Sequence, residues 1–432
     1  MMTYKKIRFG KTIALCASLL LSPQVTLAAS DEDLAAMRVQ LQALSQRLDR
    51  LESENRALTS SMAEMARTTH DTTIALADVP EINDAILSGV KEQSPTSNWA
   101  DTMRWLGDFR YRYESFDIEG QPDRNRIRIR ARAALIADVT ATTEIGFGLA
   151  SGGDDPVSSN QTLGGGGSSK ELRIDLAYFD WSGLANTHVY GGKFKNYIHR
   201  SGNNGLLWDG DWRPEGTGIK WENDLFFANG LGTWIESDSK KEQSFAYLTQ
   251  AGIKIPVGDA VTLTAGIAYH HFETRGNGSF FGDDDDFFGN SFDPVTHTYL
   301  YDYEEVELFA DLGFRLFGQP VLVFANYVQN QAVDDNDTAY AFGLKYAKAK
   351  YKGQWDFAYV YQNLEADSVL GLLTDSDFGS GGTDSKGHII KGNYAIVENI
   401  NAGFTYFINE AGLHSGDPID FNRLQVDLSF KY

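Results

Sequence analysis

Apolar and polar side chains alternate with a period of two along most of the chain beyond residue 104. In residues 124–133 every even position holds arginine, whereas Ile127, Ile129, Ala131 and Ala133 fill the odd positions from 127 onward. Successive side chains of a β-strand point to opposite faces, so this pattern predicts a strand with one cationic and one apolar face.

The same alternation recurs along the chain with aromatic residues on the apolar face, as in Phe109, Tyr111 and Tyr113. The expected strands begin near residues 104, 124, 141, 171, 187, 217, 226, 243, 261, 300, 321, 337, 354, 387, 400 and 420. We count residues 391–408 as two strands, because a single strand there would give the barrel an odd total number of strands. Soluble β-sandwiches alternate in the same way, so the alternation alone does not decide the architecture.

The connections between the expected strands alternate in length. Tight links such as residues 138–140, 256–259 and 317–320 separate long stretches at 151–170, 196–216, 273–298 and 365–387. Short turns on one side and long loops on the other are typical of transmembrane barrels, and about 16 strands leave an aqueous channel. The fold class we expect is therefore all-β, a transmembrane antiparallel β-barrel of about 16 strands over residues 101–432.

A helical period precedes the barrel. Over residues 31–67, a 3-4 spacing predicts an α-helical coiled coil, and Asn55 at an inner position would set its register and strand number. An amphipathic helix on the mouth of the barrel is the alternative. Residues 68–100 lack a pattern and are expected to be a linker. The apolar heptad positions are Leu34, Met37, Leu41, Leu44, Leu48, Leu51, Leu58 and Met65.

Residues 1–28 have the organisation of a secretory signal peptide. Lys5, Lys6 and Arg8 precede a short apolar run at 13–21, and small residues follow it. The run is shorter than the roughly 20 apolar residues that span a bilayer as a helix, although a retained anchor is the alternative. With no later apolar stretch of that length, an exported chain that crosses a membrane must do so as a β-barrel.

Composition narrows the chemistry further. The formal net charge of -21 argues against nucleic acid and against an anionic bilayer surface as partners. The single cysteine, Cys16, lies in the signal peptide, so no thiol is left for a disulfide, a metal or a nucleophile. We expect no cofactor.

The arginine row is the clearest candidate for a functional surface. An arginine on the lipid face costs about 2–4 kcal/mol near the bilayer midplane, so the row is expected to line the pore. A loop at residues 196–216, carrying Asp209, Asp211 and Glu215, is expected to fold inward and set a transverse field opposite it. Alternatively, lumenal carboxylates such as Glu144, Glu171 and Asp175 neutralise the row. The row comprises Arg124, Arg126, Arg128, Arg130 and Arg132.

Two further clusters carry weaker signals. Asp283, Asp284, Asp285 and Asp286 could bind Ca²⁺ or Mg²⁺, but such a run is more often a solvated loop tip, so no metal site is assigned. The histidines at 188, 270 and 271 are not accompanied by a serine motif. We therefore expect no enzyme, and an outer-membrane hydrolase is an alternative of lower rank.

The last strand places Leu424, Val426, Leu428, Phe430 and Tyr432 on one face. This ending resembles the C-terminal signal by which outer-membrane barrels are recognised for assembly, with Phe430 and Tyr432 as its aromatic residues. Together with the signal peptide, the coiled coil, residues 107–114 and the arginine strand, the chain resembles the bacterial outer-membrane putative porin family.

That resemblance implies a porin, a passive water-filled channel for small hydrophilic solutes or ions across the outer membrane of a Gram-negative bacterium, with the coiled coil in the periplasm. The alternative is a receptor or adhesin that acts through its long loops. Expected partners are outer-membrane lipids, lipopolysaccharide, the barrel assembly machinery and further copies of the chain, a trimer rather than a dimer. Solute identity and ion selectivity stay open.

Overall fold

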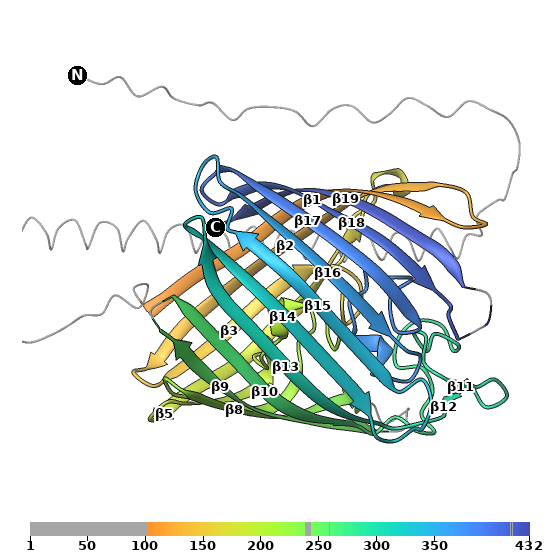
Figure 1. Cartoon of the computed structure of the whole chain (residues 1–432), viewed down its shortest axis with the longest axis horizontal. Helices are drawn as coiled ribbons and strands as arrows, with labels where there is room; N and C mark the ends of the chain where they lie inside the picture. Colours follow the sequence, from red (N-terminus) through yellow and green to blue (C-terminus); the bar gives the residue numbers. More distant parts are fainter. Residues whose placement is uncertain (1–101, 238–242, 259, 415, 417) are drawn as a thin grey trace, which may run out of the picture. The chain divides into compact units, whose positions relative to one another are not determined.

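The computed structural model describes residues 102–237, 243–258, 260–414, 416 and 418–432. In these residues, sixteen long antiparallel strands close into a barrel (Figure 1), and the two-residue strand β4 (Gln161–Thr162) extends the same sheet. The expected signal peptide (1–28), coiled coil (31–67) with Asn55, and linker (68–100) lie outside the described residues.

Each strand of the barrel pairs with its neighbours in chain order, and β1 also pairs with the last strand. The sixteen strands are β1 (Met103–Ile118), β2 (Arg124–Thr140), β3 (Thr143–Ser151), β5 (Leu172–Leu184), β6 (Thr187–Lys193), β7 (Glu215–Glu222), β8 (Phe226–Glu236), β9 (Ser244–Val257), β10 (Val261–Phe272), β13 (Tyr303–Leu316), β14 (Gln319–Asn330), β15 (Thr338–Ala347), β16 (Trp355–Leu364), β17 (Ser385–Val397), β18 (Ile400–Ala411) and β19 (Ile419–Lys431).

The strand count and order expected from the alternation are confirmed. The largest displacement is at β13, expected near residue 300 and beginning at Tyr303. Residues 391–408 do form two strands, β17 and β18, joined at Glu398 and Asn399, where Asn399 adopts a φ of 66°. Positive φ at that position is typical of the tight turns that join antiparallel strands.

The two faces of the strands differ as the bilayer requires. In β1, Tyr111 and Tyr113 are 43% and 38% exposed on the outside, whereas Arg112 and Glu114 between them are 4% and 0% exposed. A polar side chain that faces lipid has no partner for its hydrogen bonds, so the charged positions point inward. None of the helices in the described ranges is long and apolar enough to cross a membrane.

Two long loops fold into the interior, and a third, after β10, packs apolar side chains onto the same core but leaves its tip exposed. They are the loops after β6 (194–214), after β10 (273–302, with the β11–β12 hairpin Phe292–Asp293 and Thr298–Tyr299) and after β16 (365–384). Their apolar side chains pack with inward residues of the strands into one core. Its most buried members include Phe194, Leu206, Trp208, Phe272, Phe287, Tyr299, Phe324, Val328, Leu364, Val369, Leu370 and Phe407.

From the sequence, the loop at residues 196–216 was expected to fold inward, whereas the stretches at 273–298 and 365–387 were expected only as long polar connections. Their apolar residues, which are scattered along the sequence, pack against one another in the structure. They can do so because the barrel brings these loops to the same end of the strands. Burial of large side chains such as Trp208 removes apolar surface from water and holds the loops inside the barrel.

An arginine substituted on the outward face of β10 should destabilise the barrel strongly. Ile267 is 52% exposed near the middle of the strand, so Ile267→Arg is expected to lower the free energy of unfolding in lipid vesicles by about 2–4 kcal/mol. Thr264→Arg is the control, because Thr264 faces the interior opposite Asp311 and should cost less than about 1 kcal/mol. Equal losses in the two variants would contradict the assignment of faces.

Candidate functional site

Strands β1, β2 and β19 meet at the seam of the barrel and carry a continuous patch of interior arginines, here called the arginine wall. The ladders place Arg110 opposite Arg130 and Arg112 opposite both Arg128 and Asp427. The wall comprises Arg110, Arg112, Arg124, Arg126, Arg128, Arg130, Arg132 and Arg423, so it includes the whole arginine row of the sequence.

Glu114 lies at the centre of the wall and is fully buried. Its Oε1 accepts a hydrogen bond from Arg423 at 2.7 Å, its Oε2 accepts one from Arg126, and Arg112 and Arg128 lie 3.5 and 3.9 Å away. One carboxylate therefore holds four guanidinium groups from three strands, which ties both sides of the seam together.

The loop after β6 delivers Asp211 to the wall. Its carboxylate lies 2.8 Å from Arg132 Nη1 and 3.6 Å from Arg130 Nη1. A hydrogen bond from the Asp211 amide to Asp209 Oδ1, 2.7 Å long, shapes the loop at this point. Burial raises the pKa of Asp211, but the neighbouring guanidinium groups outweigh it and lower that pKa to about 2, so Asp211 is ionised at neutral and mildly acidic pH.

The loop after β16 delivers a second carboxylate, Asp377, which sequence reasoning missed. Asp377 lies 3.0 Å from Arg112 and 2.8 Å from Arg423. Burial raises its pKa, but Arg423 and Arg112 hold the pKa well below its usual value. The only sequence signal was the pair Asp375 and Asp377 inside a long stretch, with nothing to show that the loop turns inward.

Asp209 and Glu215, the other expected loop carboxylates, do not contact the arginine wall. The backbone N–H of Asp209 donates to Leu373 O at 2.7 Å, and burial raises the pKa of its carboxyl well above its usual value. Glu215 is the first residue of β7 and pairs with Lys193 at 2.6 Å. Of the three, only Asp211 reaches the arginine row, because the loop has already returned to the barrel rim at Glu215.

The arginine row is largely ion-paired, but not by Glu144, Glu171 and Asp175, the carboxylates expected to neutralise it. Glu144 pairs with Arg104, Glu171 with Arg173, and Asp175 with Arg213 at 3.3 Å. Those carboxylates lie close to the row in sequence, whereas its observed partners come from the seam and from inserted loops. They are Asp108, Glu114, Asp211, Asp377 and Asp427.

The wall still holds more arginines than carboxylates. Within the described part of the chain, Arg110 forms no ion pair, and its Nη2 donates to Asn160 Oδ1 at 2.6 Å. Arg124 lies over the ring of Phe116 at 4.7 Å instead of against a carboxylate. Counting only the wall and its direct ion-pair partners, eight guanidinium groups stand against five carboxylates, an excess of positive charge.

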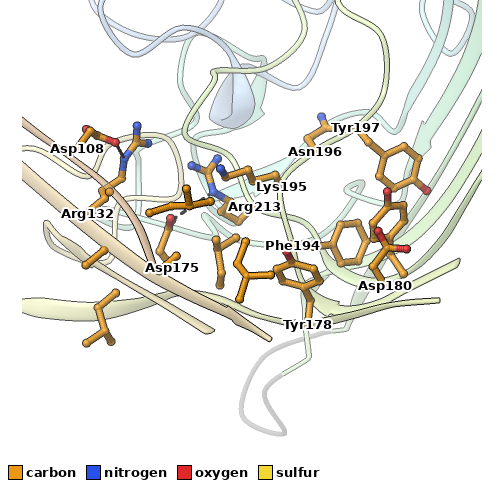
Figure 2. Close-up of a pocket in the computed structure, with 18 of the residues that line it drawn as sticks. Asp108, Arg132, Asp175, Tyr178, Asp180, Phe194, Lys195, Asn196, Tyr197 and Arg213 are labelled. Carbon is orange, nitrogen blue, oxygen red and sulfur yellow. Dashed lines mark hydrogen bonds and ion pairs between the residues drawn. The ribbon is translucent and has the colours of Figure 1, made fainter. Parts of the chain in front are cut away.

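Two cavities meet at the inserted loop. One, of about 550 Å³, includes Asp108, Arg132, Tyr178 and Lys195 in its lining (Figure 2), and the other, of about 630 Å³, includes Ser159 and Asp211. Both are also lined by Asp175 and Arg213, which form an ion pair. The pairs Asp175–Arg213 and Arg132–Asp211 thus separate the cavities.

The aromatic residues at the chain end lie at the seam. Phe430 packs against Phe109 with ring centroids 5.9 Å apart. Tyr432 exchanges two backbone hydrogen bonds with Gly107, of 2.9 and 3.1 Å, and its hydroxyl donates to Arg132 O. Through these contacts, both residues help to hold the last strand against the first when the barrel closes. Their role as an assembly signal stays a prediction.

The remaining candidates lie away from this site. Asp283–Asp286 sit in the loop after β10, where the amide of Asp283 donates to Asp286 Oδ2. Among the side chains that the structure describes, no group of three or more His, Cys, Asp and Glu residues is arranged to hold a metal ion. His270 is buried at 3.5 Å from Glu307, and His271 stacks on Tyr247 on the opposite face.

Comparison with known proteins adds a family. A family model described as "Putative porin" matches residues 116–279 and 295–432. No curated protein matches the chain. A structure titled "High pH structure of Pseudomonas putida OprB" is similar with a TM-score of 0.54 and 11% identity, covering 78% of this chain and 96% of that chain. This similarity shows a shared barrel fold.

Two mutants of Rhodopseudomonas blastica porin are also similar. The first has a TM-score of 0.44 and 10% identity, and the second has a TM-score of 0.45 and 11% identity. Each comparison covers 76% of this chain and 100% of that chain.

Neutralising Glu114 should destabilise the seam. Glu114→Gln leaves several buried guanidinium groups without their shared carboxylate, and breaking a buried ion pair in this way costs about 3–5 kcal/mol. We expect a loss of that size in the free energy of unfolding, measured by urea denaturation in lipid vesicles. Glu171→Gln, which breaks an exposed pair with Arg173, should leave the free energy of unfolding almost unchanged. A loss for Glu114→Gln no larger than for this control would refute the role of Glu114.

Proposed function

The chain belongs to the family described as "Putative porin", and we propose that solutes cross its barrel by passive diffusion past a constriction formed by the pairs Arg132–Asp211 and Asp175–Arg213. The family and the barrel fold make it a porin of the outer membrane. The constriction and its selectivity are the parts that we propose.

One observation carries the proposal, namely that two cavities share Asp175 and Arg213 on either side of the inserted loop. The cavity with Ser159 contains residues of the loop between β3 and β5, and the other contains Lys431 and Tyr432 at the opposite end of the strands. A solute that passes from one to the other must pass the charged side chains between them. Apolar solutes would have to displace the water bound there, so the route favours hydrophilic solutes.

The charge of the arginine wall supports a preference for anions. The carboxylate of Asp211 lies directly against Arg130 and Arg132. At this point the transverse field expected across the pore therefore acts over the distance of a direct contact. We infer that the pore has both a transverse field and a network of ion pairs, because most arginines of the wall are ion-paired but Arg110, among the described residues, is not. We propose that the positive excess raises the local concentration of anions at the constriction.

A receptor or adhesin that acts through its long loops is disfavoured, because two of those loops fold into the interior and part of a third packs onto the same core. Assembly into a homo-oligomer, a trimer rather than a dimer, through residues 31–67 stays a proposal. Contacts of the protein with lipopolysaccharide and with the barrel assembly machinery are also proposals. The same holds for the expectation that the protein has no cofactor.

Planar-bilayer recording tests the pore itself. The purified full-length protein should give stable conductance steps in KCl, because an open water-filled path carries ions without a conformational cycle. Incorporation into the bilayer without such steps would refute passive diffusion. A recording without conductance steps counts against the pore only if the protein is folded. Folding is checked on a gel, where a folded barrel migrates differently before and after heating.

Removing positive charges from the arginine wall and removing the charge of Asp211 should move the ion preference of the pore in opposite directions. Under a tenfold KCl gradient, Arg128→Ala combined with Arg130→Ala is expected to move the reversal potential toward cation preference by about 10 mV, within the roughly 59 mV available to a monovalent ion. Asp211→Asn should move it toward anion preference, because it removes one of the two carboxylates that pair with Arg130 and Arg132. Asp283→Asn is the control, and it should leave the potential unchanged.

If the arginine and aspartate variants both leave the reversal potential of the wild type, the wall does not control ion selection. A shift of the same sign in both would also refute the proposal, since it would indicate altered loop structure instead of altered charge.

A further inference from the structure

The 550 Å³ cavity has an aromatic side and a charged side. Figure 2 shows Tyr178, Phe194 and Tyr197 on one side, Asp108 with Arg132 on the other, and Lys195 beside Arg213 between them. The aromatic side also includes Tyr190, which stacks on Tyr197 with ring centroids 4.8 Å apart. A cavity of this size is within the range of small-molecule sites.

The aromatic side offers ring surface more than hydroxyl groups. The hydroxyl of Tyr178 donates to Glu144 at 3.0 Å, and that of Tyr197 donates to Gly230 O at 2.5 Å. With those hydroxyls already bonded to the protein, the groups left for a solute are the faces and edges of the rings. Such surfaces bind planar rings by stacking or edge contacts.

Most of the charged groups that line the cavity are already paired. Asp108 binds Arg130 and Arg132, Asp175 binds Arg213, and Asp180 binds His188 at 2.9 Å.

Lys195 differs from these neighbours. It is exposed, and within the ranges that the structure describes its ammonium group forms no hydrogen bond or ion pair. The cavity therefore presents one unengaged cation close to aromatic surface.

We propose that this cavity is a binding subsite for a solute that carries one aromatic ring and one carboxylate, with the ring against the tyrosines and the carboxylate on Lys195. The subsite rests on the proposed function, because it lies on the route from the constriction to the end of the barrel that holds Tyr432. It would slow such a solute in the pore and raise its local concentration there.

A sugar fits the lining less well. Sugar hydroxyl groups need free acceptors as well as donors, and the carboxylates of this cavity are held by Arg132, Arg213 and His188. A small carboxylate without a ring would meet Lys195 but would not use the tyrosines. A neutral aromatic solute would use the tyrosines but not Lys195.

Current block in planar bilayers separates these cases. Benzoate, acetate, benzyl alcohol and glucose are added in turn to the conducting full-length protein in KCl. Benzoate is expected to reduce the current at a concentration about tenfold lower than acetate or benzyl alcohol, because one charge-assisted contact or a set of ring contacts contributes about 1.4 kcal/mol.

Two variants test the two halves of the subsite. Lys195→Gln should weaken block by benzoate about tenfold through loss of the charge-assisted contact, and Tyr178→Leu should weaken it about fivefold through loss of ring contact. Lys254→Gln is the matched control, because Lys254 faces the interior but pairs with Glu222 away from this cavity. It should change the blocking concentration of benzoate less than about twofold, which is within the value of an exposed pair.

The results distinguish this inference from the proposed function. Absence of KCl conductance would refute the pore. Normal conductance with benzoate no more effective than acetate would refute the subsite alone, as would equal block in the wild type and Lys195→Gln. Block by glucose but not by benzoate would reassign the cavity to sugars and overturn the inference.

Discussion

The ladder between β1 and β19 joins the first and last strands of the barrel, in register from Asp108↔Lys431 to Ile118↔Phe421. In a bilayer core, an unpaired backbone N–H or C=O has no water to bind, so a sheet is stable there only when this last edge is paired. Arg112 crosses the same seam to Asp427 with two hydrogen bonds of 2.7 Å. Closure thus depends on the backbone, and interior charge reinforces it.

Closure also decides where the long loops can go. Apolar side chains of the loops after β6, β10 and β16 share one core inside the barrel with inward residues such as Phe324 and Val328. That core lines the interior from β8 to β18, and the charged cavities lie near β1 to β7. The same loops deliver Asp211 and Asp377 to the arginine wall. Two interactions therefore hold the loops in the barrel. Apolar packing removes their side chains from water, and the ion pairs of Asp211 and Asp377 fix the position of the loops against the arginine wall.

The strands of this protein could be predicted closely because alternation is a local property of each segment. The arginine row was found for the same reason, since five arginines at every second position are visible without knowledge of any other strand. Asp211 was named from its loop together with Asp209 and Glu215, and of the three only Asp211 contacts the row. A sequence does not show where a loop rejoins the sheet. Asp377 was missed, since its partners Arg112 and Arg423 come from other strands.

The sequence by itself determined which face of each strand meets lipid, how many strands there are and which side carries the long loops. These follow from the period of two and from the high cost of a charge in the bilayer. Only the tertiary structure decided which carboxylate binds which arginine and where the cavities lie. Glu114 and Arg423 are 309 residues apart, and they meet because closure of the barrel brings the chain's last strand beside its first.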